Sequence, residues 1–93
     1  MPDRVRIHAT VRGRVQMVGF RDYVSRQAAG LDVTGTVANR SDGTLECVAE
    51  GPRADVDRLV ELLRRGPRAA RVETVDIVEQ PVRGDLPHFR VTA

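Results

Sequence analysis

The fold is decided by residues 5–31, which read VRIHATVRGRVQMVGFRDYVSRQAAGL. Over residues 5–12 apolar and polar side chains alternate, which is the pattern of a strand with one buried face. From Phe20 to Leu31 the apolar residues instead recur at helical spacing, as on one face of a helix. This stretch therefore predicts a strand, a connecting loop at residues 13–19 and a helix, in that order.

The remainder of the chain adds further strands and one more helix. Strands are predicted at residues 33–39, 44–50, 71–79 and 89–91. An apolar stripe predicts a second helix at residues 53–65. Ser41-Asp42-Gly43 is typical of a hairpin turn, and Gly13 and Gly51-Pro52 are expected to end the strands before them. The apolar phase slips between Val72 and Val75, which indicates a bulge.

The resulting order is βαββαβ with a short strand added at the end. This is the order of an α+β, ferredoxin-like sandwich, in which two helices cover one face of an antiparallel sheet of four to five strands. The first and third strands are expected to pair at the centre, with the second strand beside the third. The chain is short enough to form a single domain spanning residues 1–93.

Composition excludes several classes of protein. The chain has 41% hydrophobic and 30% charged residues, as a globular domain does, and a net charge of +2. Its basic residues are all arginine and are spread along the chain, so nucleic acid is not an expected partner. No apolar run is long enough to span a membrane. With no secretion signal and a single cysteine, Cys47, we expect a small cytoplasmic monomer without disulfides.

The loop at residues 13–19 is the first candidate for a binding site. A glycine-bounded loop that enters a helix presents free backbone N–H groups and the positive end of the helix dipole, and both favour anions. Arg21, in the first helical turn, adds a cation that can bind two phosphate oxygens at once. The alternative is an ordinary connection with Arg21 on the surface. The loop lacks Gly-Lys-Ser/Thr, so neither nucleotide nor magnesium binding is indicated.

The same segment resembles a known family. Val11-Arg-Gly-Arg-Val-Gln-Met-Val-Gly-Phe-Arg21 is similar to the acylphosphatase signature V-x-G-x-V-Q-G-V-x-F-R, and Gly35-Thr-Val-Ala-Asn39 is similar to the family's G-x-V-x-N. The stretch Asp42-Gly43-Thr-Leu-Glu46, followed by Ala49-Glu-Gly51, resembles its hairpin and third strand.

The resemblance implies an enzyme that hydrolyses the carboxyl–phosphate bond of small acyl phosphates without metal or cofactor. It also implies roles for particular residues. Arg21 would bind the substrate, and Asn39 would hold the attacking water. The phosphate would lie against the amides of Val15, Gln16, Met17, Val18, Gly19 and Phe20.

Met17 departs from the family pattern, which has glycine at this position. If the backbone there needs a positive φ, methionine costs about 1–2 kcal/mol. Two readings remain open. The altered loop belongs either to an active enzyme, in which Met17 packs against the acyl group of the substrate, or to a non-catalytic module that binds anions without turnover.

For this reaction the protein needs mainly to position the substrate and the water and to neutralise the charge of the phosphate. The leaving group is a carboxylate, whose conjugate acid has a pKa near ~4, so no general acid is needed. Phosphoryl transfer depends mainly on alignment and neutralisation. The substrate phosphate can itself take the proton of the water, so no base is required. For Asn39 the alternative is a local role at the end of a strand, where asparagine is common.

Other candidate residues and functions are less favoured. His8 and His88 have no accompanying ligand set for a metal, and Cys47 alternates with core residues, so it is expected to be buried. A ferredoxin-like RNA binder stacks bases on aromatic residues of its central strands. The first and third strands here contain none. A metal carrier of this fold would need a cysteine pair, which the sequence lacks.

Overall fold

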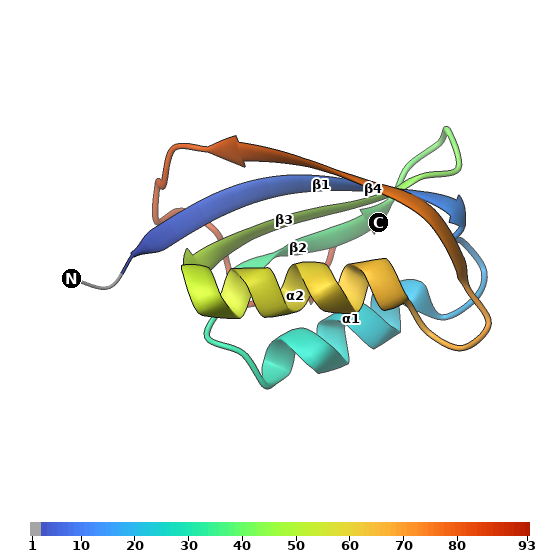
Figure 1. Ribbon diagram of the computed structural model, residues 1–93, viewed down its shortest axis with the longest axis horizontal. Helices are drawn as coiled ribbons and strands as arrows, with labels where there is room; N and C mark the ends of the chain where they lie inside the picture. The colour runs from blue at the N-terminus through green and yellow to red at the C-terminus, as the bar shows by residue number, and fades with distance from the viewer. Residues whose placement is uncertain (1–2) are drawn as a thin grey trace.

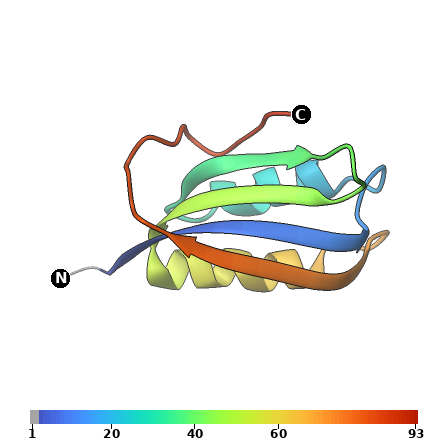
Figure 2. The ribbon, with the colours of Figure 1, turned by 90° about the horizontal axis from the view of Figure 1, so that it is seen from above.

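The computed structural model describes residues 3–93. In chain order its elements are β1 (Arg4–Arg14), α1 (Phe20–Ala29), β2 (Thr34–Asn39), β3 (Leu45–Pro52), α2 (Arg53–Arg65), β4 (Arg71–Gln80) and β5 (Arg90–Val91). The strands form one sheet in the order β4-β1-β3-β2-β5. Both helices lie on the same face of this sheet, as Figures 1 and 2 show. The ferredoxin-like arrangement predicted from the sequence is confirmed.

The core fills the layer between the helices and the sheet. Alternate residues of β1 and β3 face the helices, because successive side chains of a strand point to opposite faces. Cys47 is one of these residues and is fully buried, as predicted. The Tyr23 hydroxyl donates a 2.9 Å hydrogen bond to the Leu62 carbonyl, and the Tyr23 ring meets the buried ring of Phe20 edge-on. The hydrogen bond joins α1 to α2, and the ring contact lies within α1, next to its first residue.

The strand β1 runs two residues further than its sequence indicated. Gly13 was expected to end it, but pairing with β4 continues through Arg14. Arg12 lies opposite Thr74 whereas Gly13 lies opposite Val72, so β4 carries one extra residue and the predicted bulge is confirmed. Gly13 has φ 126°, and a Cβ there would lie 2.2 Å from the Arg71 carbonyl oxygen. Glycine therefore permits the bulge instead of ending the strand.

Two further details differ from the predictions. The strand β3 continues through Gly51 and Pro52, and α2 begins directly after it. The expected sheet was antiparallel throughout, but β5 pairs parallel to β2, so the sheet is mixed at this edge. The reason is the path of the chain. After β4, which lies at one edge, the chain crosses to the far edge and reaches β2 from the same end at which β2 starts (Figure 2).

The crossing segment is held by a buried carboxylate. The side chain of Glu50, on β3, is 1% exposed. It accepts hydrogen bonds from the backbone N–H of Arg83 at 3.0 Å and of Gly84 at 2.8 Å, and from the guanidinium of Arg6 at 3.4 Å. Burial raises the pKa of Glu50, but these hydrogen bonds and the Arg6 charge outweigh burial and leave its pKa below the ordinary value.

Candidate active site

The loop between β1 and α1 leads into a helix start without a side-chain cap. Gly19 precedes α1 in the left-handed conformation, with φ 77°, and no side chain caps the first turn. The first backbone N–H groups of a helix have no carbonyl partner within it. Together with the helix dipole they favour an anion at this position. The local structure therefore fits the anion site that the glycine pattern predicted.

Three side chains of the loop hold it in place. Val15 is buried in the core, and Val18 packs partly against it. Gln16 reaches across to the β2–β3 hairpin, where its Nε2 donates to the Arg40 carbonyl at 2.7 Å and to the Thr44 carbonyl at 3.0 Å. Gln16 and Val18 do not line the cavity described below, so their side chains act as anchors of the loop.

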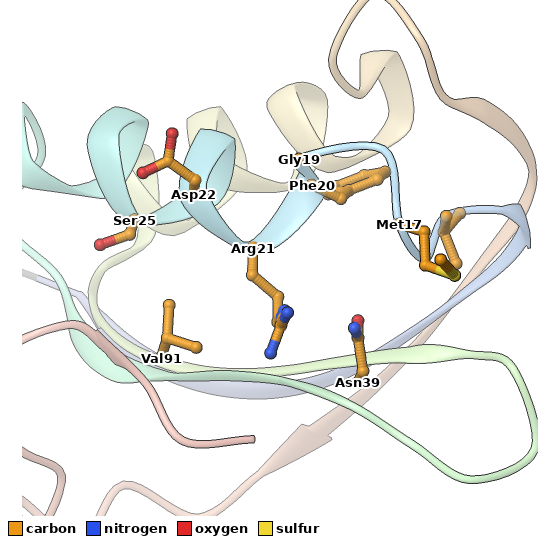
Figure 3. Close-up of a pocket in the computed structure, with 9 residues that line it drawn as sticks. Met17, Gly19, Phe20, Arg21, Asp22, Ser25, Asn39 and Val91 are labelled. Carbon is orange, nitrogen blue, oxygen red and sulfur yellow. The ribbon is translucent and has the colours of Figure 1, made fainter.

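The structure brings Arg21 and Asn39 to the same place. Arg21 extends from α1 towards the end of β2, where Asn39 lies (Figure 3). The Ala93 backbone oxygen accepts a 2.6 Å hydrogen bond from Arg21 Nη1 and a 3.1 Å hydrogen bond from the Asn39 backbone N–H. One backbone atom of the segment that follows β5 thus connects the two candidate catalytic residues.

A cavity of about 320 Å³ opens beside these groups. Its lining combines predicted residues with three that sequence reasoning missed. The residues that line it are Val15, Met17, Gly19, Phe20, Arg21, Asp22, Ser25, Asn39 and Val91. Ser25 carried a signal, because it lies four residues after Arg21 and so shares its helical face. Asp22 is adjacent to Arg21 in the sequence and carried no signal of this kind. Val91 carried none, because it reaches the site only through the parallel pairing of β5 with β2.

Two lining residues are unfavourable for stability. Met17 has φ 62°, the positive backbone angle at which a side chain is strained, and its side chain is fully exposed. Asn39 Oδ1 is buried and has no hydrogen-bond partner among residues 3–93. Each feature costs free energy that a purely structural position would not retain. Their position at one cavity therefore indicates function.

The remaining chemical groups lie elsewhere. His8 Nε2 and Arg40 Nη1 both contact Glu46 Oε2, at 2.6 Å and 2.7 Å, on the face of the sheet away from the helices. Burial raises the pKa of Cys47 to about 12, so this thiol is not a nucleophile.

Within the described part of the chain, no group of three or more His, Cys, Asp or Glu residues is arranged to hold a metal ion. None of the helices in residues 3–93 is long and apolar enough to cross a membrane.

Comparisons with known proteins identify the family of the chain. The sequence model of the acylphosphatase family matches residues 7–91. The acylphosphatase of Salinibacter ruber is 48% identical over 86 residues, which are 92% of this chain and 90% of that protein. The crystal structure of acylphosphatase from Bacillus subtilis has a TM-score of 0.91 at 31% identity and covers 96% of this chain and 99% of the other. The acylphosphatase structure from Coxiella burnetii has a TM-score of 0.90 at 42% identity, with 97% and 94% covered. The chain belongs to the acylphosphatase family.

Proposed function

We propose that this chain hydrolyses acyl phosphates to a carboxylate and inorganic phosphate, and that Arg21 and Asn39 are its catalytic residues. The observation that carries the proposal is their convergence. Arg21 from α1 and Asn39 from β2 line one cavity, and the Arg21 guanidinium and the Asn39 backbone N–H donate to the same Ala93 oxygen. A surface arginine and a local asparagine would have no reason to meet in this way.

In this proposal the phosphate lies against the loop of residues 15–20 and the guanidinium of Arg21. Because Ala93 holds Nη1, the guanidinium has a fixed orientation, and its other N–H groups remain available to phosphate oxygens. The uncapped N–H groups at the start of α1 supply the rest of the charge neutralisation. A fixed set of donors needs little rearrangement during the reaction, which is the main demand of phosphoryl transfer.

Asn39 orients the attacking water in this mechanism. Its side chain lines the cavity, so a rotation of the amide brings an oxygen or an N–H group to a water held there. The water attacks phosphorus opposite the carboxylate, the P–O bond to the acyl group breaks, and the proton passes to a phosphate oxygen. The carboxylate leaves without protonation, because its conjugate acid has a pKa of roughly 4.

The direct test is hydrolysis of benzoyl phosphate in water enriched in oxygen-18, with a chelator present. We expect turnover, with one labelled oxygen in the released phosphate and none in the benzoate. Label in benzoate would mean attack at the acyl carbon and would contradict the mechanism. Binding of inorganic phosphate without any turnover would instead support a non-catalytic anion-binding module.

A second test concerns the absence of a protein base. Asp22 is the single carboxylate side chain among the described residues that line the cavity. If the substrate phosphate accepts the proton, Asp22→Asn should lower kcat by less than about threefold, since only a general base would contribute about 10²–10⁴-fold. A loss of that larger size at unchanged KM would assign the base to Asp22.

The wider expectations for the protein follow from the same observations. Both proposed catalytic residues come from one chain, which supports a monomer acting as a single domain of residues 1–93. The lone, buried Cys47 is consistent with a cytoplasmic location. The cavity is lined by a single arginine instead of an extended basic surface, which supports a small acyl phosphate, and not nucleic acid, as the substrate.

A further inference from the structure

The side chain of Met17 has no structural role in the described protein. It is 100% exposed, so it buries no apolar surface against residues 3–93. Its backbone angle of 62° is one that glycine adopts freely and methionine does not. The position therefore carries a strained backbone and a large apolar side chain in water, and no contact within the structure compensates for either.

Met17 is part of an apolar margin around the cavity. The large hydrophobic side chains exposed in the described chain are Met17, Val78, Val82 and Val91. Two of these four, Met17 and Val91, line this cavity. In Figure 3 they stand on either side of Arg21, with Asn39 between Arg21 and Met17. Exposed apolar residues that gather at a binding cavity indicate an apolar ligand group.

The charges of the cavity point to the same kind of ligand. Among the nine lining residues that the structure describes, Arg21 is the single basic residue and Asp22 the single acidic one. Arg21 is already assigned to the phosphate. A second anionic group on the acyl part would find Asp22 and no further cation there. An uncharged acyl group is not repelled by the carboxylate of Asp22.

We propose that the acyl group accepted by this chain is uncharged and apolar, and that Met17 is the residue that selects for it by direct contact. The inference rests on the proposed hydrolase function and deepens it, because it names the class of acyl phosphate. An apolar acyl group would cover the side chain of Met17 and remove apolar surface from water. The smallest acyl groups are too short to cover Met17 and lack this stabilisation. The effect therefore appears as a higher kcat/KM for acyl phosphates with a large apolar group.

The test compares kcat/KM for benzoyl phosphate with kcat/KM for acetyl phosphate. For Met17→Ala we expect the ratio of the two values to fall about fivefold, as loss of a partly buried apolar contact predicts. Alanine keeps a Cβ at the strained backbone angle, so the change reports the side chain. Met17→Leu should retain the ratio within about twofold, and the polar Met17→Gln should lower it as alanine does.

Val78→Ala is the matched control. Val78 is 57% exposed and does not line the cavity. This variant should leave the ratio unchanged. If Met17→Ala is active but keeps the wild-type ratio, Met17 does not contact the acyl group and the inference is overturned while the proposed function stands. Failure of the wild-type protein to hydrolyse either substrate would instead overturn the proposed function and the inference with it.

A second measurement tests the charge of the acyl group separately. Butyryl phosphate and succinyl phosphate have acyl chains of similar length, but the succinyl group ends in a second carboxylate. We expect kcat/KM of the wild-type protein to be about tenfold higher for butyryl phosphate, because the cavity offers the extra carboxylate no cation. Equal values, or a preference for succinyl phosphate, would contradict an uncharged acyl group.

Discussion

Two places in this molecule combine backbone N–H groups with an arginine, and they differ in what fills them. Near the end of β3, the N–H groups of Arg83 and Gly84 and the guanidinium of Arg6 surround the carboxylate of Glu50. At the start of α1, uncapped N–H groups and Arg21 border a cavity of about 320 Å³. We call them the Glu50 site and the Arg21 site.

The difference shows how one set of donors serves stability or function. In the Glu50 site the anion is part of the protein, and its side chain is almost completely buried. The donors are satisfied, and they fasten the segment that crosses the sheet. In the Arg21 site the carboxylate of Asp22 pairs with Arg26, and no side-chain carboxylate of residues 3–93 forms an ion pair with Arg21. This site also retains a strained Met17 and an Asn39 oxygen without a partner in the described chain. Structural positions are optimised for stability, whereas functional positions retain such costs.

The largest expected effect comes from exchanging the two arginines for alanine in turn. Arg21→Ala should lower kcat/KM for benzoyl phosphate by about 10³-fold, because it removes the charge that neutralises the phosphate. Its melting temperature should change little. Arg6→Ala should do the reverse and lower the melting temperature while kcat per folded molecule stays within about threefold. Activity assays and thermal melts of both variants measure the two effects. If both variants lost activity and melting temperature to the same extent, the proposed difference between the two sites would be refuted.

Asn39→Ala should have the next largest effect. We expect kcat to fall about 100-fold with a small change in KM, because the amide orients the water and does not bind the substrate. Stability should hold or rise, since the variant removes a buried oxygen without a partner. Steady-state kinetics and denaturant unfolding measure the two quantities. A clear loss of stability would indicate that Asn39 has a structural role.

Glu50→Gln tests the Glu50 site itself. The amide keeps the shape of the side chain but loses the charge that Arg6 and the two N–H groups bind. We expect the free energy of unfolding to fall by about 2 kcal/mol, as for loss of charged hydrogen bonds in a buried site. The kcat value should stay within about twofold, because the residue is not part of the cavity. An equal loss of stability from Asp22→Asn would show that burial of the carboxylate is unimportant.

The stability difference between the wild-type protein and Glu50→Gln should depend on pH. The folded pKa of Glu50 lies below its ordinary value of 4.5, so the unfolded chain binds the proton more readily than the folded one. The stability from this group is therefore complete above about pH 4.5 and is lost as the pH falls through the folded pKa. The melting temperatures of wild type and Glu50→Gln should converge as the pH is lowered below this value. A constant difference would exclude titration of Glu50 as its source.

The smallest expected effect concerns the backbone of the Arg21 site. Met17→Gly should raise the free energy of unfolding by up to about 1 kcal/mol, because glycine adopts φ 62° without strain. The gain is partly offset by the greater freedom of glycine in the unfolded chain. Met17→Ala retains the strain and serves as the control in denaturant melts. A glycine variant less stable than the alanine variant would show that the loop is not strained at this position.

Much of the fold followed from local patterns in the sequence, and six of the nine described residues that line the cavity followed from those patterns and the family resemblance. The helix at residues 53–65 was predicted with its observed bounds, because its apolar stripe and the flanking Pro52 and Gly66 are local signals. The phase slip before Val75 indicated the bulge in the same way. Arg21 was recognised as a candidate from its place in the first turn of α1.

The features that were missed depend on contacts between distant segments. Glu50 alternates with buried residues and so reads as exposed, yet the segment after β4 covers it. Gln16 anchors the loop by donating to carbonyl groups of the β2–β3 hairpin. The residues next to Gln16 in the sequence give no sign of this contact. The sequence predicted a short strand at Val91, but not its parallel pairing with β2 or its place in the cavity.

The hydrogen bonds to Ala93 have a consequence for how activity arises during folding. A chain with both helices and the four antiparallel strands, but without β5, would show nearly native circular dichroism. In that intermediate Arg21 would lack its contact with Ala93, and the cavity would lack Val91. In the described chain β5 pairs with β2 through two residue pairs, Thr36 with Arg90 and Val37 with Val91, so we expect it to dock after the longer strand pairings have formed. In a refolding experiment, turnover of substrate should therefore appear after the secondary structure, when β5 has docked beside β2.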